Sequence, residues 1–314
     1  MIVIKLKETK MHKSLLLIAV LGTLATSTLA FAEEAAKEEK SNWNLTTNFG
    51  MVSDYYARGV SQTWHKPTVQ GGIDVTHSSG FYAGVFGSGV SPNTYPDANT
   101  EIDVYAGYNG EIKAVKGLGY TAGLIGYLYP GGSWDKFSYL GVPNQTPDGG
   151  RWNTYEANFG VSYEWISAKA SMTLGDWYGA ERKTGWDGGT NGTTYLELNA
   201  AYPLPLWDLT LIGHVGRLNV AGKLNPDFTA GNEQFPSTSA TGERSPDYTD
   251  YKIGLSKAFK IANSDGWNAG VYYTGNNNKD YWGKRGYGGA SFNGSAETKN
   301  LADDRFVFTL SRSF

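Results

Sequence analysis

The stretch TYEANFGVSYEW, residues 154–165, alternates apolar and polar side chains along its whole length. One set of positions holds Tyr155, Ala157, Phe159, Val161, Tyr163 and Trp165, and the other holds Thr154, Glu156, Asn158, Gly160, Ser162 and Glu164. Successive side chains of a β-strand point to opposite faces, so this pattern predicts a strand with one apolar and one polar face.

Segments of the same kind recur from Trp43 onward, and no segment there shows a sustained helical period. Twelve strands are predicted, at 43–56, 68–78, 81–90, 101–111, 118–129, 153–165, 168–177, 193–203, 209–220, 250–260, 267–275 and 304–314. The third and fifth alternate poorly and are predicted mainly from their positions. Most of these lengths are near the ~9–11 residues that a tilted strand needs to cross a bilayer.

The connections between these segments alternate between long and short. The odd-numbered connections are the long ones, at 57–67, 91–100, 130–152, 178–192, 221–249 and 276–303. A soluble β-sandwich has no reason to keep this parity. The sequence therefore predicts an all-β fold, a transmembrane antiparallel up-and-down β-barrel of about 12 strands with short periplasmic turns and long extracellular loops.

Aromatic residues fall at both ends of the predicted strands, mostly with the parity of the apolar face. The predicted girdle residues are Trp43, Trp165, Tyr202 and Trp267 at the short-turn end, and Tyr55, Tyr155 and Tyr251 at the long-loop end. Amphipathic rings are enriched at both membrane interfaces, so we expect these side chains to face outer-membrane lipid.

The N-terminal region has the features of a targeting segment. A basic start at Met11–Lys13 precedes an apolar run from Ser14 to Leu29 and the small-residue site Ala30-Phe31-Ala32. We predict an upstream extension and cleaved signal peptide at 1–32, a charged periplasmic linker at 33–42 and the barrel at 43–314. The alternative for the apolar run, a membrane anchor, is disfavoured because it is short for a spanning helix. The expected location is the outer membrane of a Gram-negative bacterium.

Composition narrows the classes of function. The chain of 314 residues has no cysteine, a net charge of -3, 41 glycines, 21 tyrosines and 10 tryptophans. It shows no basic patch for nucleic acid, and it has no thiolate for catalysis or metal binding. His65, His77 and His214 lack the serine neighbours of a barrel lipase, and 186–192 lacks spaced calcium ligands. We therefore expect no enzyme activity, no cofactor and no metal.

The first half of the mature chain also carries recognisable motifs. They are Ser53-Asp54-Tyr55, Arg58-Gly59-Val60-Ser61-Gln62, Pro67 to Gly71, Gly80 to Gly84, and Glu101 with Asp103, Tyr105, Gly107 and Tyr108. This series resembles the TorF-like porin family of Gram-negative bacteria. The resemblance is weak from 178 to 303. It implies an outer-membrane barrel that conducts small solutes, and it names no solute.

The polar positions of the predicted strands supply candidate lumen residues. Extending the alternation of the first strand points three residues of SDYYARGVSQ (53–62) inward, and the full set of pore-lining or constriction candidates is Asp54, Arg58, Gln62, Asp74, Glu101, Asp103, Glu156, Glu197, Lys252 and Arg305. Asp54 and Arg58 would lie ~13 Å apart on a strand, so each needs a partner elsewhere. These charges could line a constriction or brace the wall, and the sequence leaves both open.

The final run, RFVFTLSRSF, matches the strand that barrel-assembly machinery reads in outer-membrane proteins. Its signal residues are Phe306, Phe308, Leu310 and Phe314, and Arg312 departs from the usual apolar residue. Taken together, the sequence predicts a porin-like channel for small hydrophilic solutes or ions through a narrow charged lumen. The alternative is a non-conducting outer-membrane barrel with structural or adhesive loops. The oligomeric state is left open.

Overall fold

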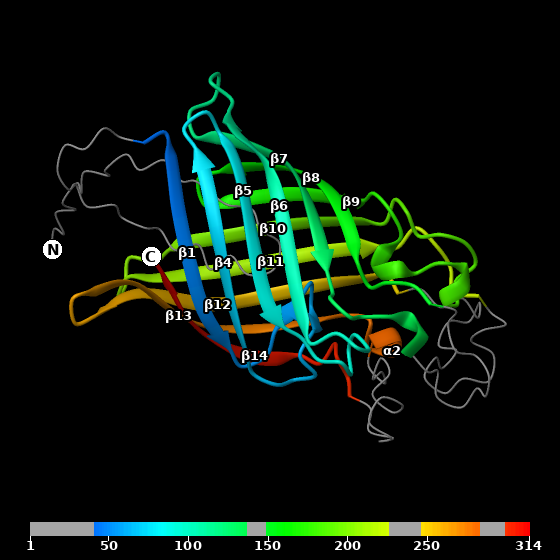
Figure 1. Ribbon diagram of the computed structural model, residues 1–314. Helices are drawn as coiled ribbons and strands as arrows, with labels where there is room; N and C mark the ends of the chain where they lie inside the picture. The colour runs from blue at the N-terminus through cyan, green and yellow to red at the C-terminus, as the bar shows by residue number, and fades with distance from the viewer. Residues whose placement is uncertain (1–40, 137–148, 226–245, 283–298) are drawn as a thin grey trace, which may run out of the picture.

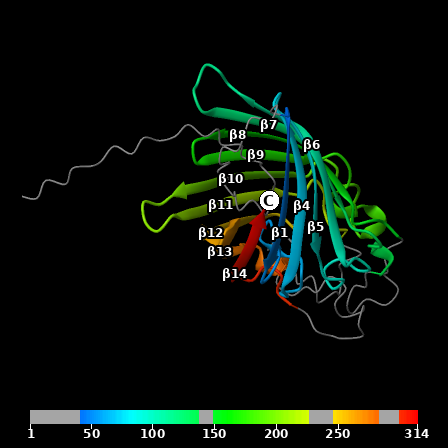
Figure 2. The ribbon, with the colours of Figure 1, turned by 60° about the vertical axis from the view of Figure 1, so that its left-hand side comes forward.

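The computed structural model describes residues 41–136, 149–225, 246–282 and 299–314, in which twelve strands form one closed antiparallel barrel (Figures 1 and 2). In order around the wall these are β1 (Trp43–Val52), β14 (Arg305–Ser313), β13 (Ser264–Asn276), β12 (Tyr248–Ile261), β11 (Leu209–Asn219), β10 (Thr194–Pro203), β9 (Ile166–Thr173), β8 (Thr154–Tyr163), β7 (Leu118–Leu128), β6 (Thr100–Glu111), β5 (Phe81–Gly89) and β4 (Thr68–His77). Every neighbour is antiparallel, and β1 closes on both β14 and β4.

The predicted twelve-stranded barrel is confirmed, and each predicted segment overlaps one wall strand. The two segments with poor alternation are β5 and β7, and each pairs with a neighbouring strand on both sides. Two boundaries were wrong by four residues, because the first strand was expected to run to residue 56 and β1 ends at Val52, and the seventh was expected to run to residue 177 and β9 ends at Thr173. Beyond Val52 the Ser53 amide donates to the Phe308 carbonyl at 2.9 Å, and the chain then leaves the wall.

The wall has an apolar outer surface and a polar inner one. On β8 the outward Phe159 is 55% exposed, whereas Glu156 on the inner face is 2% exposed. Leu45, Ile73, Leu124, Leu196, Ile253 and Phe306 repeat the outward pattern on other strands. A soluble barrel would bury these side chains, so this distribution suits a wall surrounded by lipid.

Glycines on the wall make room for tyrosine rings that cross to neighbouring strands. Gly84 of β5 lies opposite Tyr105 of β6, and a Cβ at Gly84 would lie 2.5 Å from that ring. The Tyr105 hydroxyl passes over Gly84 and donates to Asp74 of β4 at 2.5 Å. The Tyr105 side chain thus links β6 to β4 across β5, and the absence of a side chain at Gly84 leaves room for it to do so.

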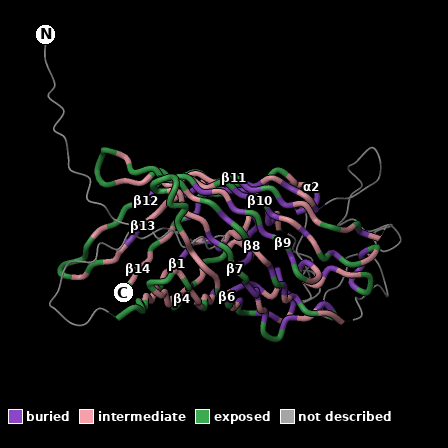
Figure 3. The backbone as a smooth tube through the Cα atoms, turned by 90° about the horizontal axis from the view of Figure 1, so that it is seen from above, coloured by how far each residue is buried: buried purple, intermediate pink, exposed green. Residues whose placement is uncertain are grey.

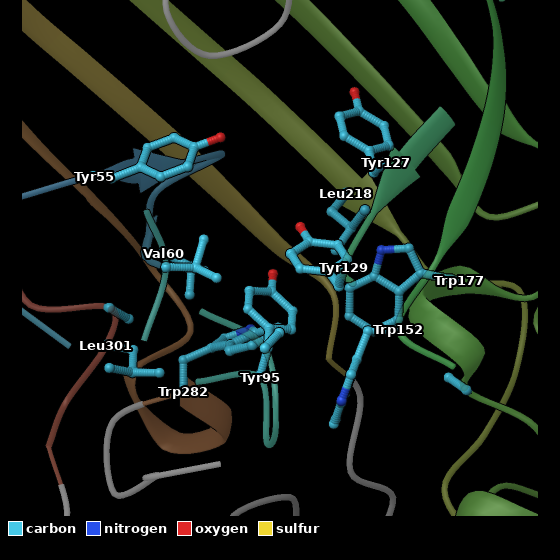
Figure 4. Packing of buried hydrophobic residues seen from close by; sticks show 14 of the residues in the cluster. Tyr55, Val60, Tyr95, Tyr127, Tyr129, Trp152, Trp177, Leu218, Trp282 and Leu301 are labelled. Atoms are coloured by element: carbon cyan, nitrogen blue, oxygen red, sulfur yellow. The ribbon is translucent and has the colours of Figure 1, made fainter. Parts of the chain in front are cut away.

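Most buried apolar side chains form one cluster toward the long-loop end, whereas Ile212, Tyr272 and Val307 are buried on the wall apart from it. Figure 3 shows buried residues concentrated toward the end that carries α2 (Lys279–Trp282) and exposed residues toward the short turns. The cluster combines wall residues with loop residues, including Tyr95, Tyr129, Trp134, Trp152, Trp177 and Trp282 (Figure 4). Three short 3-10 turns, Trp134–Lys136, Trp177–Gly179 and Arg182–Thr184, position some of these rings.

No helix in the described ranges is long and apolar enough to cross a membrane. The predicted signal peptide at 1–32 lies outside the described residues, as does the predicted linker at 33–42 except for its last two positions. Both therefore stay predictions.

Candidate functional site

The stretch SDYYARGVSQ forms a small β-hairpin that leaves the wall. β2 (Tyr56–Ala57) pairs with β3 (Val60–Ser61) across the two-residue turn Arg58-Gly59. Both turn residues have positive φ, 47° and 72°, as a type I′ turn requires. Glycine suits its position, whereas arginine is uncommon at such a φ and is held there by its surroundings. We call residues 56–61 the lumen hairpin.

The base of the lumen hairpin is fixed by one buried carboxylate. Asp54 accepts hydrogen bonds from Ser61 Oγ at 2.6 Å and from Thr63 Oγ1 at 2.9 Å, and His65 Nδ1 lies 2.7 Å from its other oxygen. The His65 ring also reaches the carbonyl oxygen of Asn300 at 2.8 Å. Asp54 therefore ties the two ends of the hairpin together.

Further bonds join the lumen hairpin to the connections around it. The Tyr56 hydroxyl donates to the Asp303 carbonyl at 2.7 Å, and the Ser61 amide donates to the Leu301 carbonyl at 2.8 Å. Beside the hairpin, Tyr95 donates to the Gln62 side chain at 2.5 Å. The hairpin is thus held by the β5–β6 and β13–β14 connections as well as by its own base.

The tip of the lumen hairpin reaches the far wall. Arg58 Nη1 and Nη2 donate to the two carboxylate oxygens of Glu156 on β8, at 2.8 and 2.7 Å. The guanidinium carbon lies 4.2 Å from the Tyr195 ring centroid and 5.9 Å from that of Tyr127. Burial alone would lower the pKa of Arg58, but the charge of Glu156 raises it well above its usual value.

Two acidic side chains on the inner face of β6 stand near this tip. Glu101 and Asp103 are 2% and 6% exposed, and Glu101 Oε2 and Asp103 Oδ1 are buried without a hydrogen-bond partner among the described residues. The other Glu101 oxygen accepts a long hydrogen bond of 3.4 Å from the Tyr55 hydroxyl. Glu101 also has side-chain hydrogen bonds with Asp103 and with Tyr129, so the two acidic groups interact with each other and with the tyrosines around them.

A second polar network lines β9 to β12. Lys169 Nζ lies 2.6 Å from Glu197, and Asn199 donates to the other Glu197 oxygen at 3.2 Å. His214 lies between the Asn199 side-chain oxygen at 2.6 Å and Asp250 at 2.9 Å. The charges of this wall thus satisfy one another in a continuous chain.

Tyr195 connects the two groups of polar side chains. Its ring stacks on the Arg58 guanidinium, and its hydroxyl donates to Asp250 at 3.0 Å. The same hydroxyl is 3.0 Å from His214 Nε2. A change at the hairpin tip can therefore reach the β9–β12 network through one side chain.

The structure places the predicted lumen residues as follows. Asp54, Arg58 and Gln62 lie in or beside the lumen hairpin; Asp74, Glu101, Asp103, Glu156, Glu197 and Lys252 lie on the inner wall; Arg305 lies exposed at the start of β14, 3.6 Å from Asp303. Arg58 has a partner on another strand, as the spacing indicated. The placement of Asp54, Arg58 and Gln62 on rungs of the first strand was wrong, because the chain has already turned inward at these positions. Whether the set lines a conducting path stays a prediction.

The structure places one of the predicted girdle residues inside the barrel and the others on its outer surface. Tyr55 was expected to face lipid and this was wrong, since it is 1% exposed and packs edge-on against Phe86 inside the mouth. On the outer surface, Trp43, Tyr155, Trp165 and Tyr202 are exposed, Trp267 and Tyr251 are half-buried, and the apolar signal residues Phe306, Phe308, Leu310 and Phe314 are exposed. Recognition of that last strand by the assembly machinery stays a prediction.

Several side chains of the site were not predicted. Tyr127, Tyr195, Lys169 and Asp250 contribute rings or charges to the networks, and all four lie on the inner face of their strands. The inward parity of the neighbouring Ser171, Glu197 and Lys252 could have identified three of them. In the described ranges no three His, Asp or Glu side chains lie close enough together to hold a metal ion.

Comparison with known proteins gives one family and a set of distant structures. A family model described as "Bacterial protein of unknown function (Gcw_chp)" matches residues 36–314. This description does not carry the TorF-like name. No curated protein matches the chain.

Among solved structures, a KdgM porin is 9% identical with a TM-score of 0.43, over 86% of this chain and 99% of that one. A NanC porin is 11% identical with a TM-score of 0.43, over 86% and 99%. OprB of Pseudomonas putida is 11% identical with a TM-score of 0.35, over 83% and 61%. The closed barrel of the present chain is established by its own strand pairing.

Proposed function

Because the chain belongs to the Gcw_chp family of bacterial proteins, whose description assigns no activity, we propose a function from the barrel itself. It is a porin-like channel of the outer membrane, through which small hydrophilic solutes or ions diffuse passively. The observation that carries this proposal is the inverted wall, which is apolar outside and charged inside. The inner face carries the ionisable side chains of Glu101, Asp103, Glu156 and Lys169. Such side chains suit a water-filled lumen that hydrophilic solutes cross, and they would be unfavourable in a sealed hydrophobic core.

The outer membrane is the environment that suits such a wall. All backbone groups of a closed barrel can pair between strands, so the wall has no unpaired edge to expose to hydrocarbon. The predicted signal peptide and the motif resemblance to TorF-like porins support the same location. We expect the assembly machinery of that membrane to insert the chain.

The lumen hairpin makes the proposed channel narrow. Its tip meets β8, which lies seven pairings from β1 in one direction around the wall and five in the other. The hairpin thus spans nearly the full width of the barrel near its long-loop end. A solute that crosses must pass beside Arg58 or displace it, so selection by size and charge follows.

Conductance of the purified barrel in planar bilayers tests this function. We expect discrete current steps from the wild type, and larger steps from a variant in which residues 56–61 are replaced by a Gly-Ser-Gly linker. An absence of steps from both proteins, each shown to be folded by heat-modifiable migration in gels, would overturn the channel.

A non-conducting barrel with structural or adhesive loops is the second candidate. The specific observation in its favour is the aromatic cluster at the long-loop end, where Trp134 and Trp152 stack at 4.0 Å between ring centroids and Tyr95 lies 4.2 Å from Tyr129. A rigid packed cap of this kind can present a fixed outer surface. The same conductance measurement decides between the two functions.

A further inference from the structure

Arg58 occupies a socket built by three wall residues. Glu156 receives its two outer nitrogens, Tyr195 lies under the guanidinium, and Tyr127 lies beside it. The Tyr127 hydroxyl is also within 3.5 Å of Arg58 Nη2. We call Glu156, Tyr127 and Tyr195 the Arg58 socket. None of the three belongs to the hairpin that delivers the arginine.

Further acidic side chains stand beside the Arg58 socket. Glu101 and Asp103 each have a buried oxygen without a hydrogen-bond partner among the described residues, and both interact electrostatically with Arg58. Asp250 of β12 approaches the turn so closely that a Cβ at Gly59 would lie 2.5 Å from its own Cβ. If the hairpin withdrew, Glu156 would join these carboxylates without its present cation.

The chemistry of the Arg58 socket selects one class of group. A carboxylate offers two parallel acceptors, which fit the paired N–H groups of a guanidinium. Aromatic faces attract a cation placed over the ring and are worth more when water is excluded. An anion would be repelled by the Glu156 carboxylate. The socket therefore fits a planar or compact organic cation.

Arg58 occupies the socket from a hairpin whose base and tip are attached separately. Among the described residues, the turn is held by the hydrogen bond from Asn276 Nδ2 to the Gly59 carbonyl at 2.9 Å and by the bonds of Arg58 itself. The hairpin base is fixed independently by Asp54, so the tip can leave while the base stays attached.

We propose that the Arg58 socket is a recognition site for guanidinium- or ammonium-bearing solutes, and that Arg58 is an intramolecular occupant which such a solute displaces. The inference rests on the proposed channel function for its biological purpose, and names the solute class of that same lumen. The binding step itself does not depend on conduction.

Self-occupancy lowers the affinity for a free cation in a calculable way. The dissociation constant rises by the inverse of the fraction of molecules whose site is vacant, so a hairpin docked about 99% of the time weakens binding about 100-fold. A variant that keeps the hairpin but lacks the guanidinium should recover most of that factor.

Arg58→Asn is the variant that separates the side chain from the turn. An Asn-Gly pair is favoured in type I′ turns, so the hairpin keeps its conformation while the socket loses its occupant. The probe is methylguanidinium in millimolar amounts, titrated calorimetrically into the detergent-solubilised barrel against equal concentrations of sodium. Arg58→Gly, which also suits positive φ, serves as the second variant if the first does not fold.

We expect methylguanidinium to bind Arg58→Asn about 100-fold more tightly than the wild type, and the double variant Arg58→Asn/Glu156→Gln to lose this binding. Arg312→Gln removes an arginine at the opposite end of the wall and should match the wild type. Equal affinity in Arg58→Asn and the wild type, or binding that survives the loss of the Glu156 charge, would overturn the proposal. A barrel that binds methylguanidinium but passes no current would retain the site and refute the channel.

Discussion

Arg58 and Glu156 stand 98 residues apart in sequence and join nearly opposite sides of the barrel through hydrogen bonds of 2.8 and 2.7 Å. Their side chains are 9% and 2% exposed. Because water is largely excluded from both ions, each depends on the other for its charge to be tolerated. The pair therefore links the tip of the lumen hairpin to the wall.

Replacing Glu156 by Gln should destabilise the folded barrel by about 2–3 kcal/mol, since Arg58 loses its buried ion-pair partner and the loss is limited by the free energy with which the hairpin tip docks. Urea unfolding of the barrel in detergent, followed by tryptophan fluorescence, measures this change. Asp265→Asn is the matched control, because the exposed Lys260–Asp265 pair at 2.9 Å should contribute no more than about 1 kcal/mol. Equal effects of the two variants would contradict the role given to burial.

Replacing Gly84 by Ala should destabilise the wall by about 1–3 kcal/mol, because the new methyl group would overlap the Tyr105 ring. Gly87→Ala on the same strand is the control, since the nearest atom to its Cβ would be a carbonyl oxygen at 3.8 Å. The melting temperatures of the two variants make the comparison. If Gly87→Ala were the more damaging, the fit between Gly84 and Tyr105 would not be what holds the three strands.

Replacing Asp103 by Lys should reduce the preference of the channel for cations. Asp103 lies on the inner face of β6 and is hydrogen-bonded to Glu101, so a lysine there adds a positive charge to the lumen whatever the protonation state of the carboxyl pair. The reversal potential across a salt gradient should shift toward that of chloride. Glu111→Lys, at the exposed short-turn end of β6, is the matched control and should leave the potential close to the wild-type value. An unchanged potential in Asp103→Lys would instead assign this position to bracing the wall.

At the outer rim, Asp304 should make stability depend on pH in the acid range. Burial tends to raise the pKa of this carboxyl, but hydrogen bonds from Lys279 at 2.7 Å and from Tyr251 hold it below its ordinary value. A lowered pKa in the folded state means that the contribution is present above the unfolded value of about 3.9 and is lost as pH falls below it.

The difference in melting temperature between the wild type and Asp304→Asn should therefore be constant near neutral pH and shrink toward zero in strong acid. Thermal unfolding from pH 7 to pH 2 measures this difference. Lys279→Ala should show the same shape. A difference that grew on acidification would contradict the sign of the pKa shift.

The number of strands, their order and the side of each that faces outward could be predicted from the sequence, because these features follow from two regular signals. Alternation in 154–165 fixes which side of β8 faces outward, and the parity of connection lengths fixes how neighbours pair. Even β5 and β7, where alternation fails, are determined by their neighbours. Local pattern and closure of the wall thus specify the same arrangement.

The lumen hairpin could not be predicted from the sequence in the same way. Residues 53–56 continue the alternation of β1, so the period alone cannot show that the chain leaves the wall after Val52. Two-residue turns are usually recognised by Asn-Gly or Asp-Gly, and arginine in the first turn position masks that signal. Tyr55 faces inward because long-range partners override local parity: Glu101 accepts from its hydroxyl, and Thr63 Oγ1 accepts from its amide.

The crossing of the lumen by this hairpin also orders events during folding. The tip follows β1 directly, yet its partners lie on β7, β8 and β10, so nothing exists for it to dock against until the far wall has been built. We therefore expect its contacts to form after the transition state of barrel closure. Weakening them should leave the folding rate nearly unchanged and speed unfolding, so the hairpin acts on the lifetime of the finished barrel.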